Sequence, residues 1–150
     1  MGERLHPFLI PGSWLLSGNY FPAEASPQRV AGSTEVTPHD QFPETLCVRG
    51  EVRGMDDPLA RPVATEFTLD LVAPGRIRFH MNSIPLGTVL VGGGVWSSVL
   101  LTIHYASPDK RILGAETYAA ESQDVVWTSG LLAADGALVT LWHARLERVG

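Results

Sequence analysis

Glu116 and Tyr118 are the two residues whose types and spacing could perform acid–base chemistry. They stand two apart in ILGAETYAA (112–120), so their side chains share one face if this segment is a β-strand. In an apolar interior the Glu116 carboxyl would resist ionisation and could act as a general acid or base, with Tyr118 donating to a substrate carbonyl. Small residues dominate the opposite face, and such residues often line curved barrel strands. The pattern therefore slightly favours Glu116 and Tyr118 outward, and both orientations stay open.

Two neighbouring residues in the segment 96–105 complete the set of candidate catalytic residues. Tyr105 alternates with apolar residues and is expected to face inward. His104 lies on a mixed face that could point either way. Convergence of Glu116, Tyr118 or His104 with Tyr20 or Tyr105 in one cavity would favour an enzyme over a carrier.

Hydroxyl and aromatic side chains on otherwise apolar faces form a second group of candidates. A cavity lined by these side chains would be mostly apolar with a few hydroxyl groups, which suits an apolar small molecule oriented by few hydrogen bonds. The alternative is that these aromatic rings simply fill a closed core. The candidate ligand-binding residues are Tyr20, Thr34, Thr65, Phe67, Phe79, Met81, Trp127, Thr140 and Trp142.

Other chemistries find little support. The five histidines show neither H-x-H nor H-x-x-x-H spacing, so no metal site is predicted. The segment GGGVWSS (92–98) is not a G-x-S-x-G elbow and precedes a strand rather than a helix, so its glycines are expected to allow a bulge or a bend at a barrel corner. Cys47 has no identifiable partner base.

Strands must position these residues, because the dominant hydrophobic period is two. In the segments 45–54, 63–72 and 76–82 one face is apolar and the other polar. Pro7 and Pro11 leave room for one helical turn in 3–10. Further strands are expected at 13–20, 29–37, 86–91, 96–105, 112–120, 123–132 and 137–148.

Short turns join these strands, which favours an antiparallel up-and-down β-barrel over a Greek-key sandwich. We predict one all-β domain over residues 1–150, with about eight to ten strands. A barrel of this size can leave a ligand cavity in its interior.

Gly12, Ser13 and Trp14 resemble the G-x-W signature that opens the first strand of lipocalin-like (calycin) barrels. The resemblance implies that Trp14 plugs the closed end of the barrel and that a late basic residue, Arg145 or Arg148, packs over it. It also implies a small-molecule carrier, a haem barrel or a cofactor-independent enzyme. No disulfide pair or second lipocalin motif is present, so a secreted transport lipocalin matches poorly.

His143 resembles the haem-ligating position of nitrobindin-like barrels, which makes haem the minor alternative to our expectation that no cofactor is needed. Its parity argues against that role, because Thr140, Trp142 and Ala144 form the drier face of the last strand.

Composition limits the partners. The net charge is −5 and the acidic residues are dispersed, so no basic footprint for nucleic acid exists. The apolar run from 84 to 101 is broken by glycine, proline and serine, so no membrane span is predicted. A single cysteine and no signal-peptide pattern favour the cytoplasm. The oligomeric state stays open, with a homodimer as one option.

These observations favour a cofactor-independent cyclase, isomerase or dehydratase (lyase) that acts on a hydrophobic metabolite such as a polyketide-like compound. The alternative is a carrier or sensor of a hydrophobic ligand. A third possibility is a filled barrel whose outer surface binds a protein.

Overall fold

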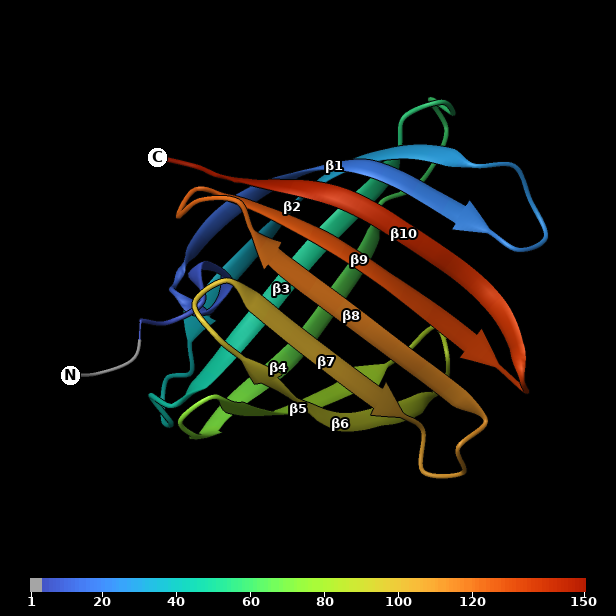
Figure 1. The fold of residues 1–150 in the computed structure, drawn as a ribbon. Coiled ribbons are helices and arrows are strands. Elements are labelled where there is room, and N and C mark those ends of the chain that lie inside the picture. The colour runs from blue at the N-terminus through green and yellow to red at the C-terminus, as the bar shows by residue number, and fades with distance from the viewer. Residues whose placement is uncertain (1–3) are drawn as a thin grey trace.

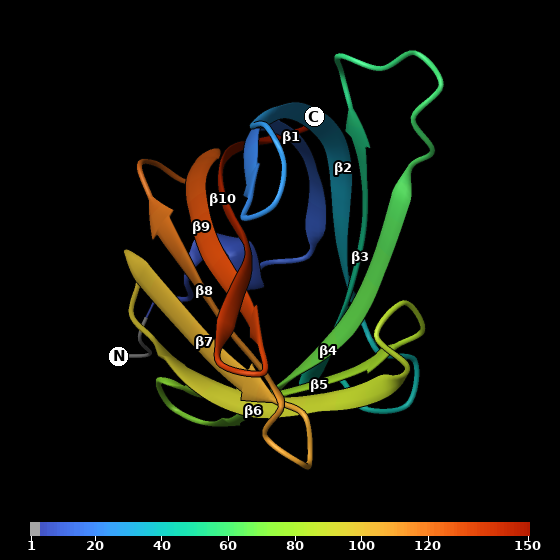
Figure 2. The ribbon, with the colours of Figure 1, turned by 90° about the vertical axis from the view of Figure 1, so that its right-hand side faces the viewer.

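The computed structural model describes residues 4–150, which form a closed antiparallel β-barrel (Figure 1). Each strand pairs with its neighbour in sequence, and the first strand pairs with the last. Figure 2 looks into the barrel, with a short helical segment at the far end. The elements are η1 (Pro7–Leu9), β1 (Gly12–Pro22), β2 (Gln28–Pro38), β3 (Thr45–Gly54), β4 (Val63–Ala73), β5 (Arg76–Ser83), β6 (Thr88–Trp96), β7 (Leu100–Ala106), β8 (Ile112–Ala120), β9 (Val125–Ala134) and β10 (Ala137–Arg148).

The predicted up-and-down barrel is confirmed, and the predicted alternation holds along β3, β4 and β5. In these strands most apolar side chains point inward and the charged ones point outward. The helical turn expected within 3–10 is η1, and the first residue of that range lies outside the described residues. In the described part of the chain, no helix is long and apolar enough to cross a membrane.

The triple glycine corrects one expectation. It forms no bulge, because β6 runs through Gly92, Gly93 and Gly94 with continuous pairing to both neighbours. A Cβ on Gly92 would meet the carbonyl oxygen of His104, and a Cβ on Gly94 would meet that of Thr102. These glycines therefore allow β6 and β7 to approach each other closely.

The closed end of the barrel is plugged by η1 and Trp14. Phe8 and Trp14 are fully buried, and their ring centres lie 6.2 Å apart. His6 fixes the segment to β8, since its Nε2 donates to the carbonyl oxygen of Tyr118 (3.0 Å) while its Nδ1 accepts from the backbone N–H of Phe8 (3.1 Å). Burial lowers the pKa of His6, which suits this neutral, doubly bonded ring.

Arg148, rather than Arg145, is the basic residue that covers Trp14. Its guanidinium carbon lies 4.2 Å from the centre of the Trp14 ring, and its Nη2 donates to the carbonyl oxygen of Pro7 (2.8 Å). Arg145 instead forms an outer-face ion pair with Glu147 at 3.0 Å. Arg148 thus joins the last strand to both η1 and β1.

Replacing Arg148 by Lys is expected to lower the free energy of unfolding by about 1–2 kcal/mol, because a lysine cannot both stack flat on Trp14 and reach Pro7. Urea denaturation measures the change. Arg145→Lys is the matched control and should cost less than about 0.5 kcal/mol, since its ion pair is solvated. Equal costs for the two variants would contradict the role assigned to Arg148.

Candidate functional site

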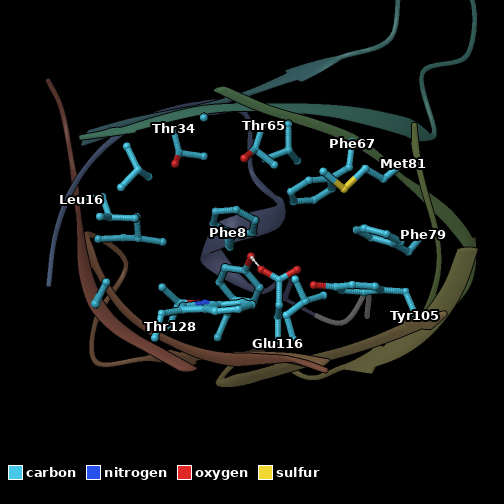
Figure 3. A pocket seen from close by; sticks show the side chains of 18 of the residues that line it. Phe8, Leu16, Thr34, Thr65, Phe67, Phe79, Met81, Tyr105, Glu116 and Thr128 are labelled. Atoms are coloured by element: carbon cyan, nitrogen blue, oxygen red, sulfur yellow. Dashed lines mark hydrogen bonds between the residues drawn. The ribbon is translucent and has the colours of Figure 1, made fainter. Parts of the chain in front are cut away.

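A cavity of about 230 Å³ occupies the barrel interior (Figure 3). Most of its wall is apolar, and Phe8 of η1 forms its floor at the closed end. No lysine, arginine or histidine lies among the lining residues of the described chain. The predicted candidates that line it are Tyr20, Thr34, Thr65, Phe67, Phe79, Met81, Tyr105, Glu116, Tyr118, Thr140 and Trp142.

Glu116 and Tyr118 face this cavity, which reverses the orientation that the small residues of 112–120 favoured. Tyr118 is buried because its ring stacks on Phe8, with 4.3 Å between ring centres and 20° between planes. Burial of this large ring outweighs the preference for small residues, and Glu116 follows because it is two residues away on the same face. The side with Ala115 and Thr117 therefore points outward.

A hydrogen-bonded cluster surrounds the Glu116 carboxylate. The Tyr118 hydroxyl donates to Glu116 Oε1 at 3.1 Å, and the Tyr105 hydroxyl points toward the same carboxylate. Figure 3 shows the Glu116 carboxylate and the Tyr105 hydroxyl directed toward each other in the cavity. Tyr105 reaches this position from β7 and stacks on Phe79, with ring centres 4.6 Å apart.

Burial sets the protonation of this cluster. Desolvation raises the pKa of Glu116 to about 7, although the hydrogen bonds from Tyr118 and Tyr105 act in the opposite direction. Burial and the nearby Glu116 charge raise the pKa values of Tyr105 and Tyr118, so both phenols stay protonated donors. Tyr20 has a raised pKa for the same two reasons. A carboxyl with a pKa near 7 can both accept and return a proton at neutral pH.

Two predicted site residues lie outside the cavity. Trp127 points to the outer face, because the neighbouring Val126 and Thr128 are the buried residues of β9. Its ring stacks on His143 at 5.4 Å. His104 is exposed on the outer face of β7, since the alternate residues Ile103 and Tyr105 are buried. Neither side chain can reach a ligand inside the barrel.

Thr128 is the lining hydroxyl that the sequence analysis missed. It pairs with Tyr118 across β8 and β9, and its side chain is buried. The alternation of Val126, Thr128 and Leu132 could have found it, had that face been taken as the inner one. The other lining residues not predicted are Phe8, Leu16, Val48, Gly50, Val52, Leu86, Leu90, Leu132, Ala144 and Leu146.

His143 does not fit a haem ligand inside the barrel. It lies on the outer face, as its parity predicted, and its Nδ1 is 2.8 Å from the hydroxyl oxygen of Ser129. The lining residues of the described chain include neither histidine nor cysteine. The residues of the cavity therefore do not match a histidine-ligated haem.

Comparison with solved structures defines the class of fold. The S-type phycobiliprotein lyase CPES from Guillardia theta has a TM-score of 0.72 at 13% identity, covering 96% of this chain and 90% of that one. Rv2717c from M. tuberculosis has a TM-score of 0.73 at 17% identity, covering 96% and 94%. A DUF3598-family protein of unknown function from Nostoc punctiforme has a TM-score of 0.65 at 13% identity, covering 98% and 51%.

This protein therefore has a calycin-like barrel fold, as the Gly12–Trp14 motif predicted. At these identities the likeness shows the fold alone. No family model matches the sequence, and no curated protein matches it.

Proposed function

We propose that this barrel is a cofactor-independent acid–base enzyme, a cyclase, isomerase or dehydratase that acts on a small hydrophobic metabolite. The observation that carries the proposal is Glu116, a carboxyl with a pKa of about 7, held by two tyrosines in an apolar cavity. Burial of a carboxyl in an apolar site is how enzymes tune its pKa toward neutral pH. As in the sequence analysis, we place the activity in the cytoplasm, because Cys47 is the only cysteine.

The size and charge of the cavity limit the substrate. A dry cavity of about 150 Å³ holds benzene, whereas drug-sized ligands take roughly 300–1,000 Å³. The 230 Å³ found here suits a compound of one or two rings. An anionic compound is disfavoured, because Glu116 lies in the wall and no cation lies among the described lining residues to balance it.

The proposed step is a proton transfer at carbon. In a β,γ-unsaturated ketone, the Glu116 carboxylate takes a proton from the carbon between the carbonyl and the double bond, which leaves a dienolate. The same carboxyl then returns the proton to the far carbon of the former double bond, so the double bond moves next to the carbonyl, the enzyme ends unchanged and the product is an isomer. Tyr105 and Tyr118 hold the carboxylate in place, and the apolar walls hold the substrate in one orientation.

A non-catalytic carrier or sensor is the second candidate. Tyr105 and Tyr118 both direct their hydroxyls to Glu116, so the cluster is satisfied without a substrate. One structural neighbour is named a phycobiliprotein lyase, which supports a small-molecule ligand for both the enzyme and the carrier candidate. The two candidates differ in whether Glu116 exchanges protons with a bound ligand.

Deuterium exchange into 2-tetralone, a neutral two-ring ketone, separates the two candidates. We expect the wild-type protein to accelerate exchange of the protons next to the carbonyl, measured by proton NMR in D₂O. The rate should rise as pH approaches 7 and level off above it, because the ionised carboxylate is the base. Glu116→Gln should lower the catalysed rate by about 10²–10⁴-fold.

Glu51→Gln, at an exposed carboxylate of β3, is the control and should exchange at the wild-type rate. If wild type and Glu116→Gln exchange equally while 2-tetralone still raises the melting temperature, the enzyme proposal is wrong and the carrier remains.

A further inference from the structure

Two groups can be distinguished among the inward-facing glycines of the barrel. In one group, represented by Gly18, Gly32 and Gly92, an added Cβ would meet backbone atoms of the adjacent strand. At Gly114 and Gly130 the nearest atoms that a Cβ would meet are instead side-chain ring atoms. The first group serves close approach of strands, and the second makes room for aromatic rings.

The Tyr105 ring occupies the space over Gly114. The two residues are paired across β7 and β8, and an added Cβ would meet Cε2, Cζ and the hydroxyl oxygen of Tyr105. The Tyr105 ring therefore lies over β8 at Gly114 and does not project into the centre of the cavity. Since Glu116 is two residues further along the same face, this path carries the Tyr105 hydroxyl to the carboxylate.

The Trp142 indole occupies the space over Gly130 in the same way. The two residues are paired across β10 and β9, and an added Cβ would meet Cζ2, Cε2 and Nε1 of the indole. Gly130 is also the partner of Glu116 across β9 and β8. An aromatic ring thus lies against the wall on each side of Glu116, one over Gly114 and one over Gly130.

We propose that Gly114 and Gly130 are positioning residues, which let Tyr105 and Trp142 lie against the wall. The two rings form a flat aromatic surface beside Glu116 that selects planar substrates. This inference rests on the proposed function only in taking Glu116 as the reacting group. Alanine at Gly114 would force the Tyr105 ring into another rotamer and move its hydroxyl away from Glu116. Alanine at Gly130 would lift the indole into the cavity.

The pKa of Glu116, measured by ¹³C NMR of the labelled carboxyl carbon, tests Gly114. Because the Tyr105 hydroxyl lowers the pKa of Glu116, Gly114→Ala should raise this pKa by about one pH unit, and Tyr105→Phe should raise it equally. The double variant should show no further rise. Gly54→Ala is the matched control, since its Cβ would meet only Ala60 Cβ at 3.8 Å. An unchanged pKa in Gly114→Ala would overturn the role of Gly114.

If Gly114→Ala does not fold, the Tyr105→Leu background, which removes the ring, should restore folding. Failure of that rescue would mean that Gly114 serves the backbone, and the proposal would be wrong.

Binding of benzyl alcohol and cyclohexylmethanol tests the flat aromatic surface of Tyr105 and Trp142. These two probes have the same number of non-hydrogen atoms, and only benzyl alcohol has a planar ring. Wild type should bind benzyl alcohol roughly threefold to tenfold more tightly by NMR titration, which is the range expected for an aromatic contact. Gly130→Ala should bring the ratio close to one, while Gly54→Ala should keep it.

A wild-type affinity ratio of one, or an affinity ratio unaffected by Gly130→Ala, would overturn the proposal that Tyr105 and Trp142 form a flat selective surface. Loss of 2-tetralone exchange alone would contradict the proposed enzyme and leave both of these measurements standing.

Discussion

Glu116→Gln is expected to make the protein more stable above pH 7, by about 3 kcal/mol, and to leave its stability at pH 4 nearly unchanged. Burial raises the pKa of Glu116 from 4.5 to about 7 in the folded protein. Between these two values the unfolded chain has released its proton and the folded chain has not. The folded state therefore binds more protons, and the wild type loses stability as pH rises through this window.

Glutamine removes this loss because it does not ionise. The free energy of unfolding from urea denaturation at pH 4, 6 and 8 measures the effect. The difference between Glu116→Gln and wild type should grow from pH 4 to pH 7 and then level off. Glu51→Gln, on the exposed face of β3, should show no such growth. A pH-independent difference for Glu116→Gln would mean that Glu116 titrates normally in the folded protein.

Phe8→Ala should lower the free energy of unfolding by about 3–5 kcal/mol, the usual cost of removing a buried phenylalanine ring. Phe8 is 1% exposed, stacks on Tyr118 and forms the floor of the cavity. Its loss would remove this floor and enlarge the cavity by about the volume of the ring. Tyr118 would also lose the stacking partner that holds its hydroxyl near Glu116.

Urea denaturation measures this cost, and Phe42→Ala is the matched control. Phe42 is 58% exposed in the loop between β2 and β3, so its truncation should cost less than about 1 kcal/mol. Similar costs for the two variants would show that η1 contributes no more to stability than a surface loop.

The fold could be predicted from the sequence because most strands contrast clearly between their faces. In β4, Phe67 and Leu69 alternate with Glu66 and Asp70, and only one orientation buries the apolar side. The short turns between such strands then favour the barrel. The Gly12–Trp14 motif predicted the closed end without identifying which arginine covers it.

The site was harder to predict, because its strands lack this contrast. In β9 both faces carry apolar residues, so the large Trp127 was assigned inward although Thr128 is the buried neighbour. In β8 the orientation of Glu116 depends on the stacking of Tyr118 on Phe8, more than a hundred residues earlier in the chain. Contacts between residues so distant in sequence leave no periodic signal.

The pairing of β1 with β10 also governs the order in which this chain can fold. Every other strand pair joins sequence neighbours, so successive hairpins can form while the chain is being synthesised. The outer edge of β1 stays open until β10 arrives, and Trp14 lacks the cover of Arg148 until then. Nascent chains that stall before β10 would expose the unpaired edges of β1 and β9. Pairing of β10 with both strands removes these edges and so protects the chain from aggregation.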